Sequence, residues 1–440
     1  MESFPTIPDW VSLEHQVAQI LTDQELHGWS FNERAAWELE STLRRELEGL
    51  VAVLRDRHPN VASNIFNPKR SNKIQGYFVS TGITEKHEHC GALIEISDCA
   101  MTRLKELSPT SRDHIAWIFQ TFYDWTPTEF TDKGKPSIDE TVLKEIGTPI
   151  ALQFFRVLEL TKQLGLLSEG INGWLKLVRD GRIHHNCSVA TATHRCAHRK
   201  PNLAQVPAEK EFRMLFTATP GLQMVGADLA GIELRMLAHY LARFDGGRYA
   251  DILLNDDIHQ VNADKIGISR RAVKTVTYAF LYGAGDEKIG LSFDPLLPKN
   301  KARKRGKEIR QAFMDAIDGL ETLVTKVKEK AAGGFINAID GRKISVDGTH
   351  KALNYLLQSS AGVIAKRWMV MAHDTIKSTN IYARQLAFVH DELQFETKLE
   401  HVNDLKLALT FSAVHAGEYY NCRLPIEAEA TVGLSWTETH

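Results

Sequence analysis

Two short apolar runs, each leading into an aspartate, constrain the fold of this chain more than any other feature of its sequence. The run at residues 223–227 precedes Asp228, and the run at residues 386–389 leads into a turn that contains Asp391. Short apolar runs bounded by turn residues are typical of strands, and the second run predicts a hairpin with acids at its tip. The long stretch between the two runs has helical periodicity. We therefore expect a sheet that is assembled from both sides of a long helical insertion.

The first third of the chain is predicted to be a helical lobe. Leucines spaced by three and four residues begin soon after Asn32, which can serve as an N-cap. Ser111 is expected to cap a second helix, and residues 139–167 form a third helical region that is interrupted near Gly147. The pattern changes at Trp174–Val178, which is typical of a strand.

Length and composition bound the class of protein. A chain of 440 residues is too long for one simple core and indicates two or three lobes. It has no secretory signal, no apolar run long enough to span a membrane and only five cysteines, so we expect a cytoplasmic protein without a membrane partner. The net charge of −2 argues against a protein that coats DNA by bulk charge. It still allows local basic surfaces, such as the cluster at residues 299–310.

The acids at the strand ends can carry chemistry as well as structure. Asp228 can cap the helix that follows it, or it can project into a cleft and bind a divalent cation. Asp391 and Glu392 can serve the turn, yet apolar strands flank them, and a buried carboxylate needs a partner charge or a metal. Two such carboxylates meeting in space would form a two-cation site, in which one ion activates an attacking oxygen and the other stabilises a leaving pyrophosphate.

A helix beginning at Ser269 carries the most informative pattern. Residues four apart lie along one stripe of a helix, and here that stripe presents two cations followed by two aromatic rings, Arg270, Lys274, Tyr278 and Tyr282. Cations suit a triphosphate, and rings beyond them suit a base or a sugar. The alternative is a solvated amphipathic helix that ends at a glycine cap, Gly283.

These segments resemble three motifs of the family-A DNA polymerases. The stripe from Arg270 to Gly283 is similar to motif B, Asp228–Arg235 to motif A and Val389–Glu392 to motif C, in the order of that family. The likeness runs from about residue 20 to the C-terminus, and it is strongest to the replicative polymerases of short-tailed, T-odd-type phages. Longer shared stretches are Ser111–Ile115, Thr131–Gly134, Pro201–Gln205, Leu281–Gly290 and Leu353–Ser359.

The resemblance implies roles for the motif residues. Asp228 and Asp391 would hold two Mg²⁺ ions together with the carbonyl group of Leu229, and the expected catalytic residues are Asp228, Asp391, Glu392 and Lys274. Contacts to the incoming dNTP are implied for Leu229, Glu233, His259, Arg270, Lys274, Tyr278 and Tyr282. Contacts to primer-template DNA are implied for Arg195, Asn202, Asn354, Gln358 and His390.

Two of these residues would select the sugar, and a third would lie near the template. Glu233 would exclude a 2′-hydroxyl group, and Tyr278 would tolerate a missing 3′-hydroxyl group, so dideoxynucleotides should terminate synthesis. Tyr282 would stack near the templating base. The segment Thr193-His194-Arg195 departs from the family's Thr-Gly-Arg and puts the geometry of that loop in question.

The resemblance also implies an α+β right-hand fold with an antiparallel palm sheet and helical fingers. We expect a thumb and N-terminal helical region at residues 1–165, the palm at 166–250 and 346–440, and the fingers at 251–345. The expected function is DNA-directed addition of dNTPs to a primer 3′ end. The alternatives are a non-catalytic DNA-binding replication scaffold derived from a polymerase and, with less support from Glu233 and Tyr278, an RNA polymerase.

We expect no 3′-5′ exonuclease in this chain. Asp23-Gln24-Glu25 matches the Asp-x-Glu of such domains only superficially, and a separate exonuclease or other replisome proteins remain possible partners. The segment at residues 58–108 is too short for the insertion that recruits thioredoxin in the phage relative, so thioredoxin is not an expected partner. If a phage encodes the chain, its location would be the host cytoplasm.

Two groups of histidines and cysteines lack the paired Cys-x-x-Cys spacing of a zinc site. The first group lies in the early part of the chain, and the second overlaps the segment around Arg195. Their members are His87, His89, Cys90 and Cys99, and His185, Cys187, His194, Cys196 and His198.

Overall fold

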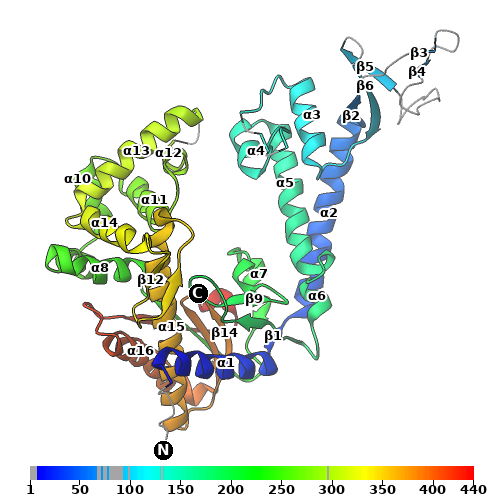
Figure 1. Ribbon diagram of the computed structural model, residues 1–440. Coiled ribbons are helices and arrows are strands. Elements are labelled where there is room, and N and C mark those ends of the chain that lie inside the picture. The colour runs from blue at the N-terminus through cyan, green and yellow to red at the C-terminus, as the bar shows by residue number, and fades with distance from the viewer. Residues whose placement is uncertain are drawn as a thin grey trace, which may run out of the picture. The chain divides into compact units, whose positions relative to one another are not determined.

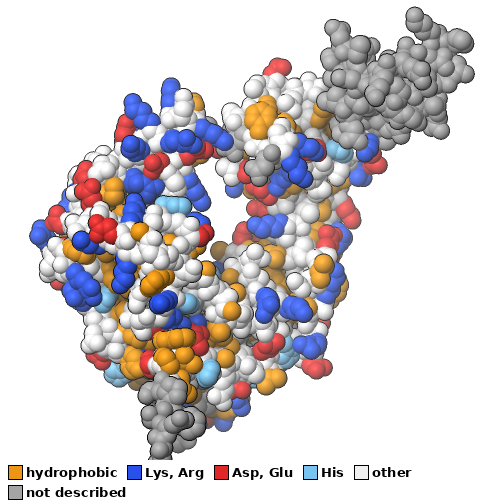
Figure 2. Space-filling view, viewed as in Figure 1, with side chains coloured by type: hydrophobic (Ala, Val, Ile, Leu, Met, Phe, Trp, Pro, Cys, Tyr) orange, Lys and Arg blue, Asp and Glu red, His pale blue; other side chains and the backbone are white. Residues whose placement is uncertain are grey.

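The computed structural model describes residues 7–66, 71–72, 77–78, 93–97, 100–128, 130–131, 133–294 and 297–440. The chain divides into two compact units, residues 36–175 and Met1–Ala35 together with Lys176–His440. Figure 1 shows the elements of both units, and Figure 2 shows the types of side chain on the same face. Each unit encloses a hydrophobic core of its own.

Long helices dominate the smaller unit. Its helices are α2 (Glu33–Arg57), α3 (Arg112–Phe122), α4 (Glu140–Ile146), α5 (Pro149–Leu164), the π-helical turn Gly165–Glu169 and the start of α6 (Trp174–Leu177). Its strands are β2 (Asn60–Phe66), β3 (Ser71–Asn72), β4 (Tyr77–Phe78), β5 (Leu93–Ser97) and β6 (Ala100–Glu106). Leu54, Phe119 and Phe154 are fully buried where α2, α3 and α5 pack together.

Caps set the boundaries of these helices where the sequence predicts them. The side chain of Asn32 accepts a hydrogen bond from the backbone N–H of Ala35 at 3.1 Å, and that of Ser111 accepts one from His114. Gly147 ends α4 in the left-handed conformation with φ of +64°, which glycine adopts at low cost. Thr148 then caps α5. The predicted interruption near Gly147 is confirmed.

The larger unit is built around a four-stranded antiparallel sheet in the order β14-β15-β11-β16. Its strands are β11 (Gln223–Leu229), β14 (Ala383–Val389), β15 (Glu392–Thr397) and β16 (Ala428–Gly433). The central strands β11 and β15 come from opposite ends of the helical region, so the sheet is assembled from both sides of the insertion, as predicted. In their register Asp228 pairs with Glu392.

Helices make up the rest of the larger unit, together with three small sheets. The helices are α1 (Asp9–His27), α7 (Lys210–Arg213), α8 (Ile232–Asp245), α9 (Arg248–Asn255), α10 (Ile258–Ile266), α11 (Arg270–Leu281), α12 (Asp286–Phe293), α13 (Lys299–Ala316), α14 (Leu320–Ala331), α15 (Ala352–Ser378) and α16 (Val402–Tyr419). Short 3₁₀ turns span Leu203–Gln205, Thr349–Lys351, Leu399–His401 and Trp436–Glu438. The small sheets are formed by β1 (Trp29–Phe31), β7 (Arg182–Ile183) and β10 (Phe216–Thr217), by β8 (Asn186–Ser188) and β9 (Ala197–Arg199), and by β12 (Phe335–Asn337) and β13 (Lys343–Ser345).

Helix α15 is the central support of the larger unit. It packs against α1, α8, α14 and α16, which explains why its buried residues lie on every side of the helix. Its fully buried Trp368 donates a hydrogen bond to the carbonyl group of Leu409 on α16 at 2.8 Å. Buried Lys366 on α15 binds the carboxylate of Glu14 on α1 at 2.7 Å.

The structure differs from the sequence analysis at Trp174–Val178. This segment, predicted to be a strand, begins with the helical turn α6 because a short apolar run that buries Trp174 fits either conformation. The compact unit at residues 36–175 does not include α1, which packs against α15 and β14 of the larger unit. Among the described helices, none has the length and apolar character needed to cross a membrane.

Candidate active site

The two aspartates singled out by the sequence lie side by side at one end of the central strands. Asp228 is the penultimate residue of β11, and Asp391 lies in the two-residue loop between β14 and β15. The backbone N–H of Leu229 donates a hydrogen bond to the carbonyl group of Asp391 at 3.0 Å, which links the two chain segments directly. The adjacent His390 has φ of +60°, a conformation that non-glycine residues rarely adopt outside constrained turns.

Electrostatics make these carboxylates unfavourable as isolated anions. Burial and the charge of Asp228 raise the pKa of Asp391 to about 7. Asp228 is exposed at the surface, yet the surrounding protein and the nearby charge of Glu392 raise its pKa to about 6. Within the described part of the chain, no Lys, Arg or His forms an ion pair with either side chain. Oxygen ligands of this kind are the ones that Mg²⁺ prefers, so the pair fits a divalent cation.

Glu392 has a different environment from the two aspartates. It is 5% exposed, and its carboxylate accepts hydrogen bonds from the indole of Trp436 at 2.6 Å and from the amide of Gln394 at 2.6 Å. Its other oxygen lies 2.8 Å from Nδ1 of His440 and raises the pKa of that imidazole. Glu392 is thus fixed in place directly beside Asp391. Trp436 and His440 were not predicted to take part in the site, because no local pattern shows that the C-terminal segment contacts Glu392.

Helix α11 begins after Ser269 and buries its apolar face, as the sequence predicts. The side chain of Ser269 caps it by accepting a hydrogen bond from Ala272, and Val276 and Phe280 are buried. The rings of Tyr278 and Tyr282 are stacked with centroids 6.5 Å apart. The two cations of the stripe, Arg270 and Lys274, are exposed.

The aromatic end of the stripe faces the acids of the sheet. The hydroxyl group of Tyr282 donates a hydrogen bond to Glu233 on α8 at 3.2 Å. Burial raises the pKa of Tyr282 to about 12, with further contributions from Glu233 and Asp391. Burial and the same two acids also raise the pKa of Tyr278. These interactions of Tyr278 and Tyr282 with Glu233 and Asp391 show that the three sequence motifs lie close together in space.

The cationic end of the stripe includes groups that can receive an anion. Arg270 binds Asp257 at 2.6 Å, while Lys274 has no hydrogen-bond or ion-pair partner among the described residues. His259 lies with its ring centroid 6.1 Å from that of Tyr278, and its buried Nδ1 has no hydrogen-bond partner within the described structure. Burial and the charges of Arg270 and Lys274 lower the pKa of this histidine. A phosphate group would supply the missing acceptors.

Arg195 joins the same cluster through a largely buried ion pair. Its guanidinium group lies 2.5 Å from the carboxylate of Glu233, and their side chains are 17% and 13% exposed. The preceding His194 has φ of +59°, so the loop keeps the left-handed conformation in which glycine would be favoured. Gly362 on α15 lets this loop approach closely, because a Cβ there would lie 3.2 Å from Cγ of Arg195. The departure from Thr-Gly-Arg has therefore not changed the backbone conformation that suits glycine.

The other residues expected to contact DNA have varied surroundings. Asn354 and Gln358 lie one turn apart on α15, and the Asn354 amide donates a hydrogen bond to the carbonyl group of Leu281 at 2.6 Å. Asn202 caps the turn Leu203–Gln205 by accepting a hydrogen bond from Ala204 at 3.1 Å. His390 is exposed at the hairpin tip. The structure thus brings Arg195 and His390 close to the acids and gives Asn202 a capping contact.

The second group of histidines and cysteines and the Asp-x-Glu segment make structural contacts in the described part of the chain. The described residues contain no group of three or more His, Cys, Asp or Glu arranged to hold a metal ion, and the group His87, His89, Cys90 and Cys99 lies outside them. His185 and His198 instead stack with centroids 5.7 Å apart. The Asp-x-Glu segment lies on α1 rather than on a strand, and Glu25 accepts a hydrogen bond from Asn186 at 2.8 Å.

An antiparallel sheet with paired acids at its strand ends, faced by a helix that carries cations and tyrosines, defines a nucleic-acid polymerase of the right-hand class. The family model described as DNA polymerase family A matches residues 84–438. The chain belongs to this family and is a DNA-directed DNA polymerase.

Similar proteins support this assignment. The DNA-directed DNA polymerase of Enterobacteria phage T3 is 30% identical over 499 aligned residues, which cover 98% of this chain and 70% of that protein. The enzyme of Escherichia phage T7 is 30% identical over 501 residues with the same coverage. The POL domain of Pol1 from M. smegmatis, in complex with DNA primer-template and dNTP, matches the fold with a TM-score of 0.74. It is 21% identical, and the match covers 97% of this chain and 70% of that one.

Proposed function

We propose that this chain adds dNTPs to the 3′ end of a primer on a DNA template by two-metal-ion nucleotidyl transfer. The observation that carries the proposal is the side-by-side position of Asp228 and Asp391, whose pKa values are raised and which have no cationic partner among the described residues. A non-catalytic scaffold would gain nothing from keeping two such costly acids together.

Asp228, Asp391 and the carbonyl group of Leu229 are the proposed ligands of two Mg²⁺ ions. When bound, these ions would activate the attacking 3′-oxygen of the primer and stabilise the leaving pyrophosphate. Glu392 would fix the position of Asp391 through its own hydrogen bonds to Trp436, Gln394 and His440. Much of the rate would come from positioning and charge neutralisation.

The cationic stripe is the proposed triphosphate site. Lys274 and the unpartnered Nδ1 of His259 would contact phosphate oxygens, and Arg270 would do so by exchanging its bond to Asp257. Glu233, held by Arg195 and Tyr282, is rigid enough to exclude a 2′-hydroxyl group. Tyr278 would lie against the sugar and accept dideoxynucleotides.

DNA contacts are proposed for Arg195, Asn354, Gln358 and His390, and for Asn202 beyond its capping bond. We assign the thumb to the smaller unit, the palm to the four-stranded sheet with its flanking segments, and the fingers to residues 251–345. We also propose that this chain itself does not trim a mismatched 3′ end, since its Asp-x-Glu segment lies on a helix and Glu25 accepts a hydrogen bond from Asn186.

Primer extension tests the proposal. Asp228→Asn and Asp391→Asn should each lower the rate of dNTP addition by a factor of about 10² or more, while primer-template binding in a gel-shift assay stays largely intact. Glu429→Gln is a matched control, because Glu429 is an exposed acid on β16 whose backbone lies opposite that of Asp228 in the sheet. Its effect should stay within about fivefold, as expected for an exposed charge. Near-normal synthesis by either aspartate variant would contradict the mechanism.

A further inference from the structure

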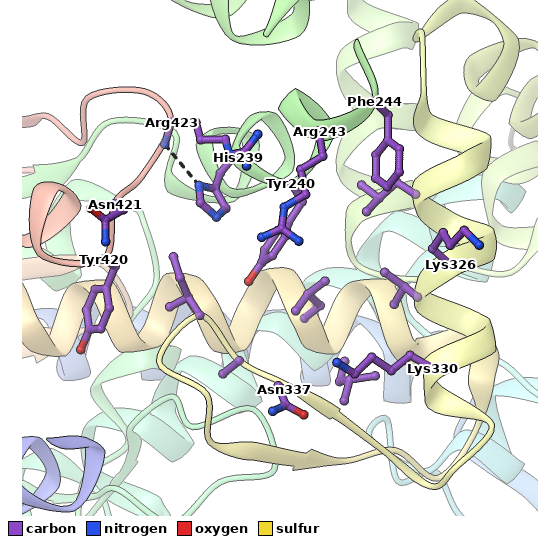
Figure 3. A pocket seen from close by; sticks show the side chains of 16 residues that line it. His239, Tyr240, Arg243, Phe244, Lys326, Lys330, Asn337, Tyr420, Asn421 and Arg423 are labelled. Carbon is purple, nitrogen blue, oxygen red and sulfur yellow. Dashed lines mark hydrogen bonds between the residues drawn. The ribbon is translucent and has the colours of Figure 1, made fainter. Parts of the chain in front are cut away.

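The larger unit has a pocket away from the candidate active site, and none of the proposed catalytic, dNTP-binding or DNA-binding residues lines it. Its volume is about 490 Å³, and its walls come from α8, α14, the segment around β12, α15 and the loop that follows α16 (Figure 3). Pockets of this size are typical of sites for small molecules.

The walls of this pocket are aromatic and aliphatic. Tyr240 and Phe244 on α8 and Tyr420 after α16 contribute three rings, and Phe244 is 39% exposed. Leu323, Val327 and Ile336 complete much of the apolar lining. The hydroxyl group of Tyr240 is fixed by Ser360 at 2.8 Å, so this ring is held in place by α15. Rigid rings at a concave surface are suited to stacking against a planar group.

Cations surround the same pocket without matching acids. Arg243, Lys326, Lys330 and Arg423 line it, and none of its lining residues, all within the described structure, is Asp or Glu. Lys326 is paired with Glu329 at 3.3 Å, whereas no ion pair of Arg243, Lys330 or Arg423 is found among the described residues. The nearby Asp340 is bound to Arg342 at 2.6 Å. The pocket therefore carries uncompensated positive charge, which favours an anion.

The directions of the side chains distinguish the cations from one another. Figure 3 shows the ammonium group of Lys330 pointing inward from α14, while that of Lys326, one turn earlier on the same helix, points away. Buried His239 anchors the opposite side, where its Nδ1 accepts a hydrogen bond from the backbone N–H of Arg423 at 3.2 Å. Burial lowers the pKa of His239 to about 4, so this group is a neutral anchor at pH 7.

From these features we propose that the pocket binds a nucleoside phosphate at a site separate from the dNTP site. The phosphate groups would bind Arg243, Lys330 and Arg423, and the base would pack against the rings of Tyr240, Phe244 and Tyr420. Free phosphate would leave the aromatic walls unused, and an uncharged aromatic ligand would leave the cations unused. A nucleoside phosphate uses both halves of the pocket.

Calorimetric titration of the full chain with ATP, in EDTA and without DNA, tests this inference. Lys330→Ala and Arg243→Ala should each weaken ATP binding by about tenfold or more, through loss of a charge-assisted hydrogen bond. Lys326→Ala is the matched control and should change the affinity by less than about twofold, because its charge is exposed and already paired. Lys274→Ala removes a cation of the proposed dNTP site and should leave this binding intact.

Three results would overturn the proposal. The first is the absence of ATP binding. This result would overturn the proposal even if the pocket bound an acidic peptide instead. The second is binding that Lys274→Ala abolishes and Lys330→Ala leaves unchanged, which would assign it to the dNTP site. The third is equal affinity for ATP and inorganic tripolyphosphate, which would show that the rings contribute nothing. Primer extension by Lys330→Ala at saturating dNTP should be normal, so failure here is distinguishable from failure of the proposed polymerase mechanism.

Discussion

Glu396 gives the sharpest prediction about what stabilises the strand that carries the hairpin tip. It lies on β15, and its side chain is 1% exposed. Its carboxylate lies 2.6 Å from Nε2 of His27 and 3.3 Å from Arg182, and it accepts hydrogen bonds from the backbone N–H and the hydroxyl group of Thr219 at 2.8 and 2.7 Å. Burial alone would raise the pKa of Glu396, but these partners outweigh it and lower the pKa to about 2.

The expected magnitude follows from this pKa. Lowering it from 4.5 to about 2, at about 1.36 kcal/mol for each pH unit, corresponds to about 3 kcal/mol of stability. Because the carboxylate is more acidic in the folded state, this stability is fully present above pH 4.5 and is lost as the pH falls from 4.5 toward 2. Glu396→Gln should therefore lower the free energy of unfolding by about 3 kcal/mol at pH 7, and the difference should shrink below pH 4.5.

Urea denaturation followed by tryptophan fluorescence, at a series of pH values, measures this difference. Glu400→Gln is a suitable control, since the Glu400 side chain is 69% exposed and should contribute about 1 kcal/mol or less. A difference below about 1 kcal/mol for Glu396→Gln at pH 7, or one that is the same at pH 3 and pH 7, would refute the reasoning.

Two further predictions concern Glu233, which is proposed to exclude a 2′-hydroxyl group, and the loop that contains His194. Glu233→Ala should raise the incorporation of ribonucleotides relative to deoxynucleotides by about tenfold or more in single-nucleotide extension. Unchanged selectivity would show that Glu233 does not exclude the 2′-hydroxyl group. His194→Gly should raise the melting temperature by relieving about 1 kcal/mol of left-handed strain, helped by removal of an imidazole nitrogen that is buried without a partner in the described structure. A lower melting temperature would show that the packing of the imidazole outweighs the strain.

Local sequence signals are sufficient to predict several helix starts in both units and the strands that carry the paired aspartates. The caps at Asn32, Ser111 and Ser269 are short-range hydrogen bonds between neighbouring residues, so the sequence pattern alone specifies them. Apolar runs and turn residues likewise predict the strand that ends near Asp228 and the hairpin around Asp391. Each of these signals spans fewer than about ten residues, which is why it can be read without tertiary structure.

Contacts between distant segments could not be predicted in the same way. The network that joins Glu392 to Trp436 and His440 depends on the return of the chain to β15 after α16, and no local pattern encodes that path. The bond between Arg195 and Glu233 also links separate elements. At Trp174 the failure has another cause, because a short apolar run can be buried equally well as a helical turn or as a strand.

Metal binding in solution tests the central claim most directly, because it does not depend on catalysis. Mn²⁺ can be titrated into the full chain without DNA or nucleotide, with the free ion measured by electron paramagnetic resonance. We predict that the unaltered chain binds Mn²⁺ and that its affinity for the ion falls by about tenfold or more in Asp228→Asn and in Asp391→Asn. The affinity should be nearly unchanged in Glu429→Gln. Equal Mn²⁺ binding by the unaltered chain and both aspartate variants would contradict a metal site formed by these two carboxylates.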